Sequence, residues 1–247
     1  MRRPLAVGLA TSTAGLAALA YPIATSGHGQ AQLAPWLMAA LVPLSLLLLA
    51  TELSSHAIDG RSLALLGVLA ACGAALRIPS PGVAGIEPVF FLLVVAGAVF
   101  GSGFGFALGA LTLLVSAAFT GGVGPWLPFQ MLAAAWLGAG AGALPPRLQG
   151  RVGLAVYTSA ACLIYGAVMN LWFWPYGLGE GTSLSFQPGA GVGVNLSRFV
   201  AFDLTTSMGF DLPRAIINAA LVATVGVPLA ATLRRMHRRA SFVPSAS

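Results

Sequence analysis

The chain has 247 residues, of which 57% are hydrophobic and 7% are charged, and its mean hydropathy is +0.89. Soluble domains carry about 25% charged residues, so this composition excludes a soluble fold and indicates an integral membrane protein. The formal net charge is +6, and every basic residue is Arg. These Arg residues stand in short clusters beside apolar runs, where retention of positive loops in the cytoplasm explains them better than nucleic-acid binding does.

Apolar runs bounded by Gly, Pro and charged residues predict an all-α polytopic membrane bundle of about eight transmembrane helices. In chain order, the predicted helices are Leu5–Ala24, Pro35–Leu53, Ser62–Leu76, Val89–Phe100, Gly103–Phe119, Leu127–Leu144, Val152–Trp174 and Leu212–Leu233. We expect residues 1–60 to form two N-terminal membrane helices, residues 61–240 a six-helix core, and residues 241–247 a cytoplasmic tail.

The stretch from Glu87 to Pro146 organises this pattern, because no charged residue occurs between Glu87 and Arg147. Its first run, Val89–Phe100, has about a dozen residues and is short for a full crossing. The break at residues 101–105 is so short that it predicts an antiparallel hairpin with glycines at its tip. Short membrane helices are tolerated only where protein or a water-filled cavity covers the backbone, so we expect a cavity nearby.

The distribution of Arg residues predicts the orientation in the membrane. With a cytoplasmic amino terminus and eight helices, Arg77, Arg198 and Arg214 are the only Arg residues on the outer side. The positive-inside rule favours this arrangement. We therefore expect a multi-pass plasma-membrane protein with both termini in the cytoplasm.

The connection Pro175–Asp211 is the only long one, and this topology places it outside. Within it, Asn195 is expected to cap a short helix that lies on the outer membrane face. Connections of this length are usually lids or binding loops. The apolar positions of the helix recur at helical spacing and are Leu196, Phe199, Val200 and Leu204.

Sequence motifs of enzymes are absent. The chain has no His-Glu-x-x-His, no Asp pair with metal spacing and no Gly-x-Ser-x-Gly, and its glycine-rich segment at residues 101–105 lacks the Lys of a phosphate loop. Cys72 and Cys162 fall in apolar runs and are expected to pack as buried thiols. We expect no catalytic residue, metal site or cofactor, although a membrane-embedded enzyme or a non-transport scaffold remains the alternative.

Polar and aromatic side chains converge near the predicted outer ends of the helices, which favours a ligand site there. Simpler roles stay open for each of them: Trp as an interfacial anchor, amides as helix-to-helix hydrogen bonders, and Glu87 as a partner of a helix dipole or of Arg77. The candidate substrate-binding residues are Arg77, Glu87, Trp126, Gln130, Asn170, Trp172, Asn195 and Arg198.

Small residues recur four apart along the predicted helix Ser62–Leu76. Such a smooth face allows another helix to approach closely. It serves either internal packing or docking of another membrane subunit. The candidate docking residues are Gly67, Ala70, Ala71 and Ala74.

The central block resembles the substrate-binding S component of energy-coupling factor (ECF) transporters. The resemblance covers residues 62 to about 235 and rests on a small-residue first core helix followed by a Pro-flanked short helix. The motifs that carry it are Phe90-Phe91, Ala96-Gly97, Phe100-Gly101, the glycine-spaced run Gly103–Ala110, Gly121-Gly122 and Pro128-Phe129-Gln130.

This resemblance implies a membrane subunit that binds a vitamin or similar micronutrient from outside and delivers it by docking on a transmembrane coupling subunit that carries two ATPases. It also implies that the docking candidates contact the coupling subunit, and that residues 78–86, 119–127 and 175–211 gate the ligand. The two N-terminal helices are additional to the family's core. The mouth of the expected cavity is aromatic and nearly neutral, and the connection Pro175–Asp211 that would cover it is long. Cobalamin or another corrinoid is therefore the best single expectation for the substrate.

Overall fold

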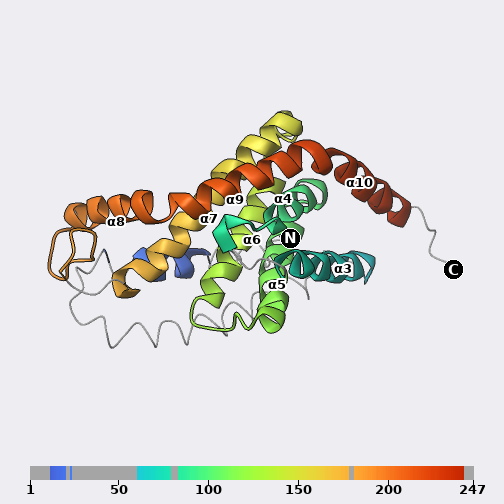
Figure 1. The fold of residues 1–247 in the computed structure, drawn as a ribbon. Helices are drawn as coiled ribbons and strands as arrows, with labels where there is room; N and C mark the ends of the chain where they lie inside the picture. The colour runs from blue at the N-terminus through green and yellow to red at the C-terminus, as the bar shows by residue number, and fades with distance from the viewer. Residues whose placement is uncertain (1–11, 21–22, 24–59, 79–82, 178–180, 242–247) are drawn as a thin grey trace.

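A computed structural model describes residues 12–20, 23, 60–78, 83–177 and 181–241. These residues contain helices and no strand, which confirms the all-α prediction for the part of the chain described (Figure 1). Besides a helical stretch at residues 12–20, the principal helices are α3 (Gly60–Arg77), α4 (Val89–Phe100), α5 (Ser102–Thr120), α6 (Leu127–Ala143), α7 (Arg151–Gly177), α8 (Val192–Thr206), α9 (Met208–Leu221) and α10 (Val227–Ser241).

Among the described residues, three helical segments are long and apolar enough to cross a membrane: Ser102–Thr120, Arg151–Gly177 and Met208–Met236. The last combines α9, a π-helical turn at Val222–Gly226 and most of α10. The sequence predicted this helix only from Leu212 onward, which was wrong at its amino-terminal end. As a result, Asp211 lies inside the helix, three residues before Arg214, and not in the preceding connection.

The short helix α4 has the twelve residues that the sequence predicted. It is apolar on all sides, as expected of a helix enclosed by protein, and eight of its residues are buried. Among them, Phe90 and Leu93 are fully buried. Because neighbouring helices surround it, α4 does not need the length of a helix that faces lipid.

Glycines allow α4, α5 and α6 to pack backbone against backbone. Gly101 joins α4 to α5 with a φ of 93°, a conformation that only Gly adopts readily, and this confirms the predicted hairpin. A Cβ atom on Gly138 of α6 would overlap the carbonyl group of Gly105 on α5, and one on Gly97 of α4 would overlap the carbonyl group of Gly138. We call these three helices and their glycine contacts the glycine core.

The helical stretch at residues 12–20 lies against α6 and α7. The indole Nε1 of Trp136 donates a hydrogen bond to Ser12 Oγ at 2.8 Å, and Leu19 is buried beside Phe129. This stretch falls within the predicted first helix, Leu5–Ala24. The predicted second helix, Pro35–Leu53, lies outside the described residues.

Helices α8, α9 and α10 follow one another along one side of the bundle (Figure 1). Helix α8 begins at Val192 with Gly191 as its N-cap, so the prediction that Asn195 caps it was wrong. The predicted apolar positions Leu196, Val200 and Leu204 are exposed. The buried side of α8 presents Phe202 and the fourth predicted apolar residue, Phe199, which pack in an aromatic cluster with Trp174 and Phe186.

Candidate functional site

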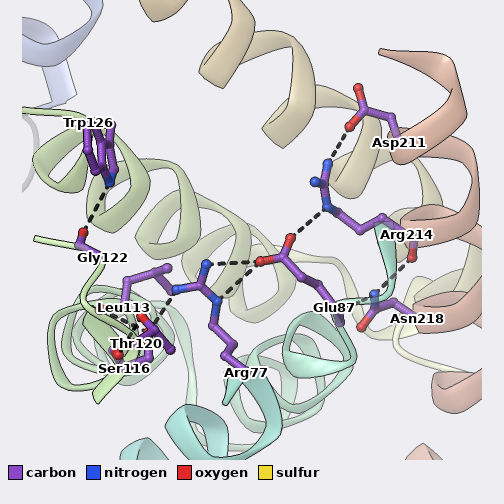
Figure 2. Close-up of polar contacts among 10 residues, drawn as sticks. All are labelled: Arg77, Glu87, Leu113, Ser116, Thr120, Gly122, Trp126, Asp211, Arg214 and Asn218. Atoms are coloured by element: carbon purple, nitrogen blue, oxygen red, sulfur yellow. Dashed lines mark hydrogen bonds and ion pairs between the residues drawn. The ribbon is translucent and has the colours of Figure 1, made fainter. Parts of the chain in front are cut away.

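A chain of four charged side chains crosses the interior of the bundle (Figure 2). Arg77, at the end of α3, donates from Nε and Nη2 to Glu87 Oε1 at 3.2 and 3.0 Å. Arg214 of α9 donates from Nε to Glu87 Oε2 at 3.0 Å and from Nη1 to Asp211 Oδ1. Glu87 therefore bridges two guanidinium groups that come from opposite ends of the folded core sequence. We call these four residues the charged seam.

All four members of the charged seam are buried, with exposed fractions of 3% to 9%. Buried charges are costly unless they are paired and hydrogen-bonded. Here two cations and two anions alternate, so the seam carries no formal net charge. Buried ionisable residues among membrane helices are candidates for a functional site.

Two further polar residues tie the charged seam to its helices. Asn218 of α9, which has no exposed surface, donates from Nδ2 to the backbone oxygens of Glu87 and Arg214 at 2.8 and 2.9 Å. Its Oδ1 accepts from the backbone N–H of Phe91 at 2.8 Å. The first N–H groups of a helix lack partners within the helix, so Asn218 supplies a cap that α4 does not provide for itself. Ser116 Oγ accepts from Arg77 Nη1 at 2.8 Å.

Aromatic rings cover the Arg214 end of the charged seam. The guanidinium carbon lies 5.4 Å from the ring centroid of Tyr165 and 6.0 Å from that of Phe90. The two rings are 4.6 Å apart. Cation–π contacts strengthen when water is excluded, so these rings help to hold Arg214 in one position.

A cavity of about 260 Å³ lies beside the charged seam. Its walls come from α3, Glu87 in the turn before α4, α6, α7, the residue that joins α8 to α9, and α9 itself. Asn170 donates from Nδ2 to Asp203 Oδ1 at 2.6 Å and to Ser207 Oγ at 2.5 Å, so it links α7 to α8. The residues that line the cavity are Arg77, Glu87, Gln130, Tyr165, Gly166, Met169, Asn170, Ser207, Phe210, Asp211 and Arg214.

The structure brings half of the predicted substrate-binding residues to this cavity: Arg77, Glu87, Gln130 and Asn170. Trp126 and Trp172 do not line it. Their rings contact each other edge to face, with centroids 6.3 Å apart, and the indole Nε1 of Trp126 donates to the backbone oxygen of Gly122.

Asn195 and Arg198 lie in the connection that contains α8. The side-chain amide of Asn195 exchanges two hydrogen bonds with the backbone of Gln187. Arg198 Nη1 donates to the backbone oxygens of Thr182 and Ser185, both at 3.1 Å. Arg198 lines a separate cavity of about 430 Å³. Both side chains hold the loop before α8 in its observed shape.

Sequence reasoning missed Tyr165, Asp211, Arg214 and Asn218. The available signal was an Asp and an Arg three residues apart next to a long apolar run, because ionisable residues within membrane helices face a partner or a cavity. That signal was lost when the helix was predicted to begin after Asp211. Arg214 was then counted only for the orientation of the chain.

Of the four predicted docking residues, two face outward and two face inward. Gly67 and Ala71 are exposed on α3, and a side chain added at Gly67 would meet nothing within 4 Å. Ala70 and Ala74 are buried, at 1% and 2% exposure. Cys72 is exposed, so the prediction that its thiol is buried was wrong, because it shares the outward side of α3 and not the side packed on α5.

The family model for the substrate-specific component of ECF transporters matches residues 61–229. The chain belongs to this family. It is therefore a membrane-embedded, substrate-binding subunit of a transporter, and the resemblance noted from the sequence is confirmed. No curated protein and no solved structure matches the chain. The matched range begins at the second residue of α3 and ends within α10, so it contains the whole charged seam.

Proposed function

We propose that this S component captures a small-molecule micronutrient from outside the cell in the cavity beside the charged seam. The proposal rests on one observation. Segments from both ends of the core sequence enclose a set of buried charges with no net charge, together with aromatic rings. Ligand sites are typically concave and mostly apolar, with a few polar groups that fix orientation. The connection that carries α8 contributes Ser207 to the wall and is the natural lid.

The size of the cavity bears on the substrate. Pockets for drug-sized ligands measure about 300–1,000 Å³, and this cavity measures about 260 Å³. A vitamin-sized ring compound suits that volume. The sequence led us to expect cobalamin or another corrinoid, because the α8 connection is long. A ligand of that size would fit only if this connection moved outward and enlarged the cavity.

We propose that the S component delivers the substrate by docking on a membrane coupling subunit that carries two ATPases, as membership of the family implies. The outward face of α3 is the docking surface that we favour. Gly67 and Ala71 lie on it, and small residues allow close approach of a partner helix in a membrane. Ala70 and Ala74 lie on the buried side of α3 and pack inside the bundle.

The topology that we propose has eight crossings and both termini in the cytoplasm. It rests on the Arg distribution and places the cavity mouth outside. Single Cys residues at Ser183 and Gln149 in a Cys-free background test it. An impermeant thiol reagent should label the first from outside intact cells and should spare the second, whereas labelling at residue 149 would overturn the orientation.

Co-purification tests the function. The tagged chain, isolated from its native membranes, should bring along an ATP-hydrolysing complex, and deletion of the chain should abolish uptake of one compound in a panel of radiolabelled vitamins. Purification without any ATPase, together with unchanged uptake of the whole panel, would favour a scaffold or a membrane-embedded enzyme instead.

A further inference from the structure

One oxygen of the charged seam has no hydrogen-bond partner in the part of the chain that the structure describes. Both oxygens of Glu87 accept hydrogen bonds from guanidinium groups, and Asp211 Oδ1 accepts from Arg214. Asp211 Oδ2 is buried and accepts no hydrogen bond within the described residues. Figure 2 shows this second oxygen directed away from Arg214. A buried carboxylate oxygen without a donor is rare in folded proteins and calls for an explanation.

The surroundings hold this carboxylate in place beside the cavity. Arg214 fixes its other oxygen, and Asp211 is only 3% exposed. Gly166 of α7 lies directly against the carboxylate, because a Cβ atom there would overlap both of its oxygens and its carbon. Both residues line the cavity, so the unpartnered oxygen belongs to a carboxylate packed on the α7 backbone at the cavity wall, where a small rearrangement on binding would bring a ligand's donor group to it.

The other charged groups at the cavity are already engaged. All three guanidinium nitrogens of Arg77 donate to Glu87 or Ser116, and Arg214 uses two of its nitrogens on carboxylates. An anionic ligand would have to displace these ion pairs. A ligand that donates a hydrogen bond, by contrast, could bind Asp211 Oδ2 without displacing an ion pair.

The remaining walls suit a flat ring. Tyr165, Phe210 and Met169 supply apolar surface, and Gln130 supplies an amide. The Gln130 side chain makes no hydrogen bond within the described residues, so it is available to a ligand. Together with the volume of about 260 Å³, these walls define a compact site with one charged acceptor.

From these observations we infer that the substrate is a small, single-ring compound that presents an amino group or a protonated amine to Asp211 Oδ2. This inference rests on the proposed function and narrows its substrate class. The N–H group would complete the carboxylate's hydrogen bonds, and charge-assisted hydrogen bonds of this kind are stronger than neutral ones. The ring would lie between the aromatic and thioether side chains, with the Gln130 amide setting its orientation.

Matched probes test this inference on the purified full-length protein in lipid nanodiscs. The first pair is 4-amino-2-methylpyrimidine and 2,4-dimethylpyrimidine, which differ by an amino group in place of a methyl group of similar size. The second pair is benzylamine and ethylbenzene. Titration calorimetry should show binding of at least one amine and at least tenfold weaker binding of its methyl partner. Binding of neither amine, or equal binding within each pair, would overturn the inference.

A variant locates the contact. Asp211→Asn keeps the shape and an oxygen for Arg214 but turns the free acceptor into a donor, so the preference for the amine should fall to about threefold or less. Asp203→Asn removes the same charge from a carboxylate that does not line the cavity. It keeps an oxygen to accept the hydrogen bond from Asn170, so it should keep the preference. If Asp211→Asn retained the full preference, the contact would lie elsewhere. If the variant did not fold, the probe pairs on the unchanged protein would still decide.

The two proposals can fail separately. Co-purification with an ATP-hydrolysing complex, combined with no preference for amines, would leave the transport function standing and remove only this substrate class. Amine binding without any ATPase partner would remove the transport function and keep the site.

Discussion

The glycine core and the charged seam solve the problem of helix association in a membrane in opposite ways. In the glycine core, α5 and α6 approach until backbone faces backbone, and a Cβ atom at Gly105, Gly109 or Gly138 would overlap main-chain atoms of the facing helix. In the charged seam, long side chains from α3, from α9 and from Glu87 in the turn before α4 keep the helices apart, and a cavity of about 260 Å³ lies beside them.

The difference shows how one bundle can be rigid in one half and receptive in the other. Close backbone packing leaves no room for a ligand. Side-chain bridges leave space, and each bridge is a polar contact that a ligand or a movement of the lid can rearrange. The α4 helix belongs to both regions, because its Gly97 contacts α6 and its amino-terminal end is capped by Asn218.

The largest expected effect is on the glycine core. Gly138→Leu introduces a side chain where even a Cβ atom would overlap the Gly105 carbonyl. Since backbone cannot yield as a flexible side chain does, we expect a loss of at least about 3 kcal/mol of stability, at the upper end of overpacking costs, and little folded protein by size-exclusion chromatography.

Gly67→Leu is the matched control for this change. Position 67 is open, so the same substitution should leave yield and melting temperature near those of the unchanged protein. Equal damage by both substitutions would mean that position 67 is packed as tightly as position 138, which would contradict this account.

The next largest effect should come from the charged seam. Glu87→Gln removes the anion between Arg77 and Arg214, which stand with nine-tenths or more of their surface buried. Removing one partner of a buried ion pair costs roughly 3–5 kcal/mol, and we expect a correspondingly lower melting temperature. Asp203→Asn is the control, because its carboxylate is only half-buried and belongs to none of the ion pairs found. A smaller fall for Glu87→Gln than for Asp203→Asn would contradict this account.

Much of the glycine core could be predicted from the sequence. The bounds of α4 matched the predicted ones, and the hairpin at Gly101 followed from a break too short for a loop. Both features depend on local chain properties, namely apolar run length and the conformational freedom of Gly. Both properties can be read from a single stretch of sequence, without knowing which distant residues pack against it.

The charged seam could be predicted only in part, because its partners are distant in the chain. Arg77 and Glu87 stand ten residues apart, and their pairing was anticipated. Arg214 lies 127 residues from Glu87, and no local pattern links them. Asn195 illustrates the same limit: its residue type suits a helix cap, but its bonds to Gln187 depend on the path of a loop.

Helix α3 joins the two regions, and its outward face offers a prediction on transport. Ala71→Trp fills an exposed position, so ligand affinity and melting temperature should remain close to normal while uptake is abolished, because a bulky side chain blocks close approach of a partner helix. Ala74→Trp places the same side chain at a position with 2% exposure and should destabilise the protein. Normal uptake with Ala71→Trp would remove this face as the docking surface.

A moderate effect is expected at the lid side of the cavity. Asn170→Ala removes both hydrogen bonds that tie α7 to Asp203 and Ser207. The substrate should bind about five- to 150-fold more weakly, equivalent to about 1–3 kcal/mol for loss of buried hydrogen bonds. Titration calorimetry of a confirmed ligand measures this change, and unchanged affinity would exclude Asn170 from the site.

The smallest effect on binding is expected at Trp172, although Trp172 and Asn170 lie two residues apart on α7. Trp172 packs beside Phe129 and Trp126, with ring centroids 5.9 and 6.3 Å away, and it does not line the cavity. Trp172→Ala should therefore lower the melting temperature through lost aromatic contacts, each worth about 0.5–1.5 kcal/mol beyond area burial, while affinity in the surviving protein changes less than about twofold. A loss of affinity as large as that of Asn170→Ala would show that the site extends from the charged seam to the aromatic residues at the end of α7, and that the substrate is larger than the cavity beside Asp211.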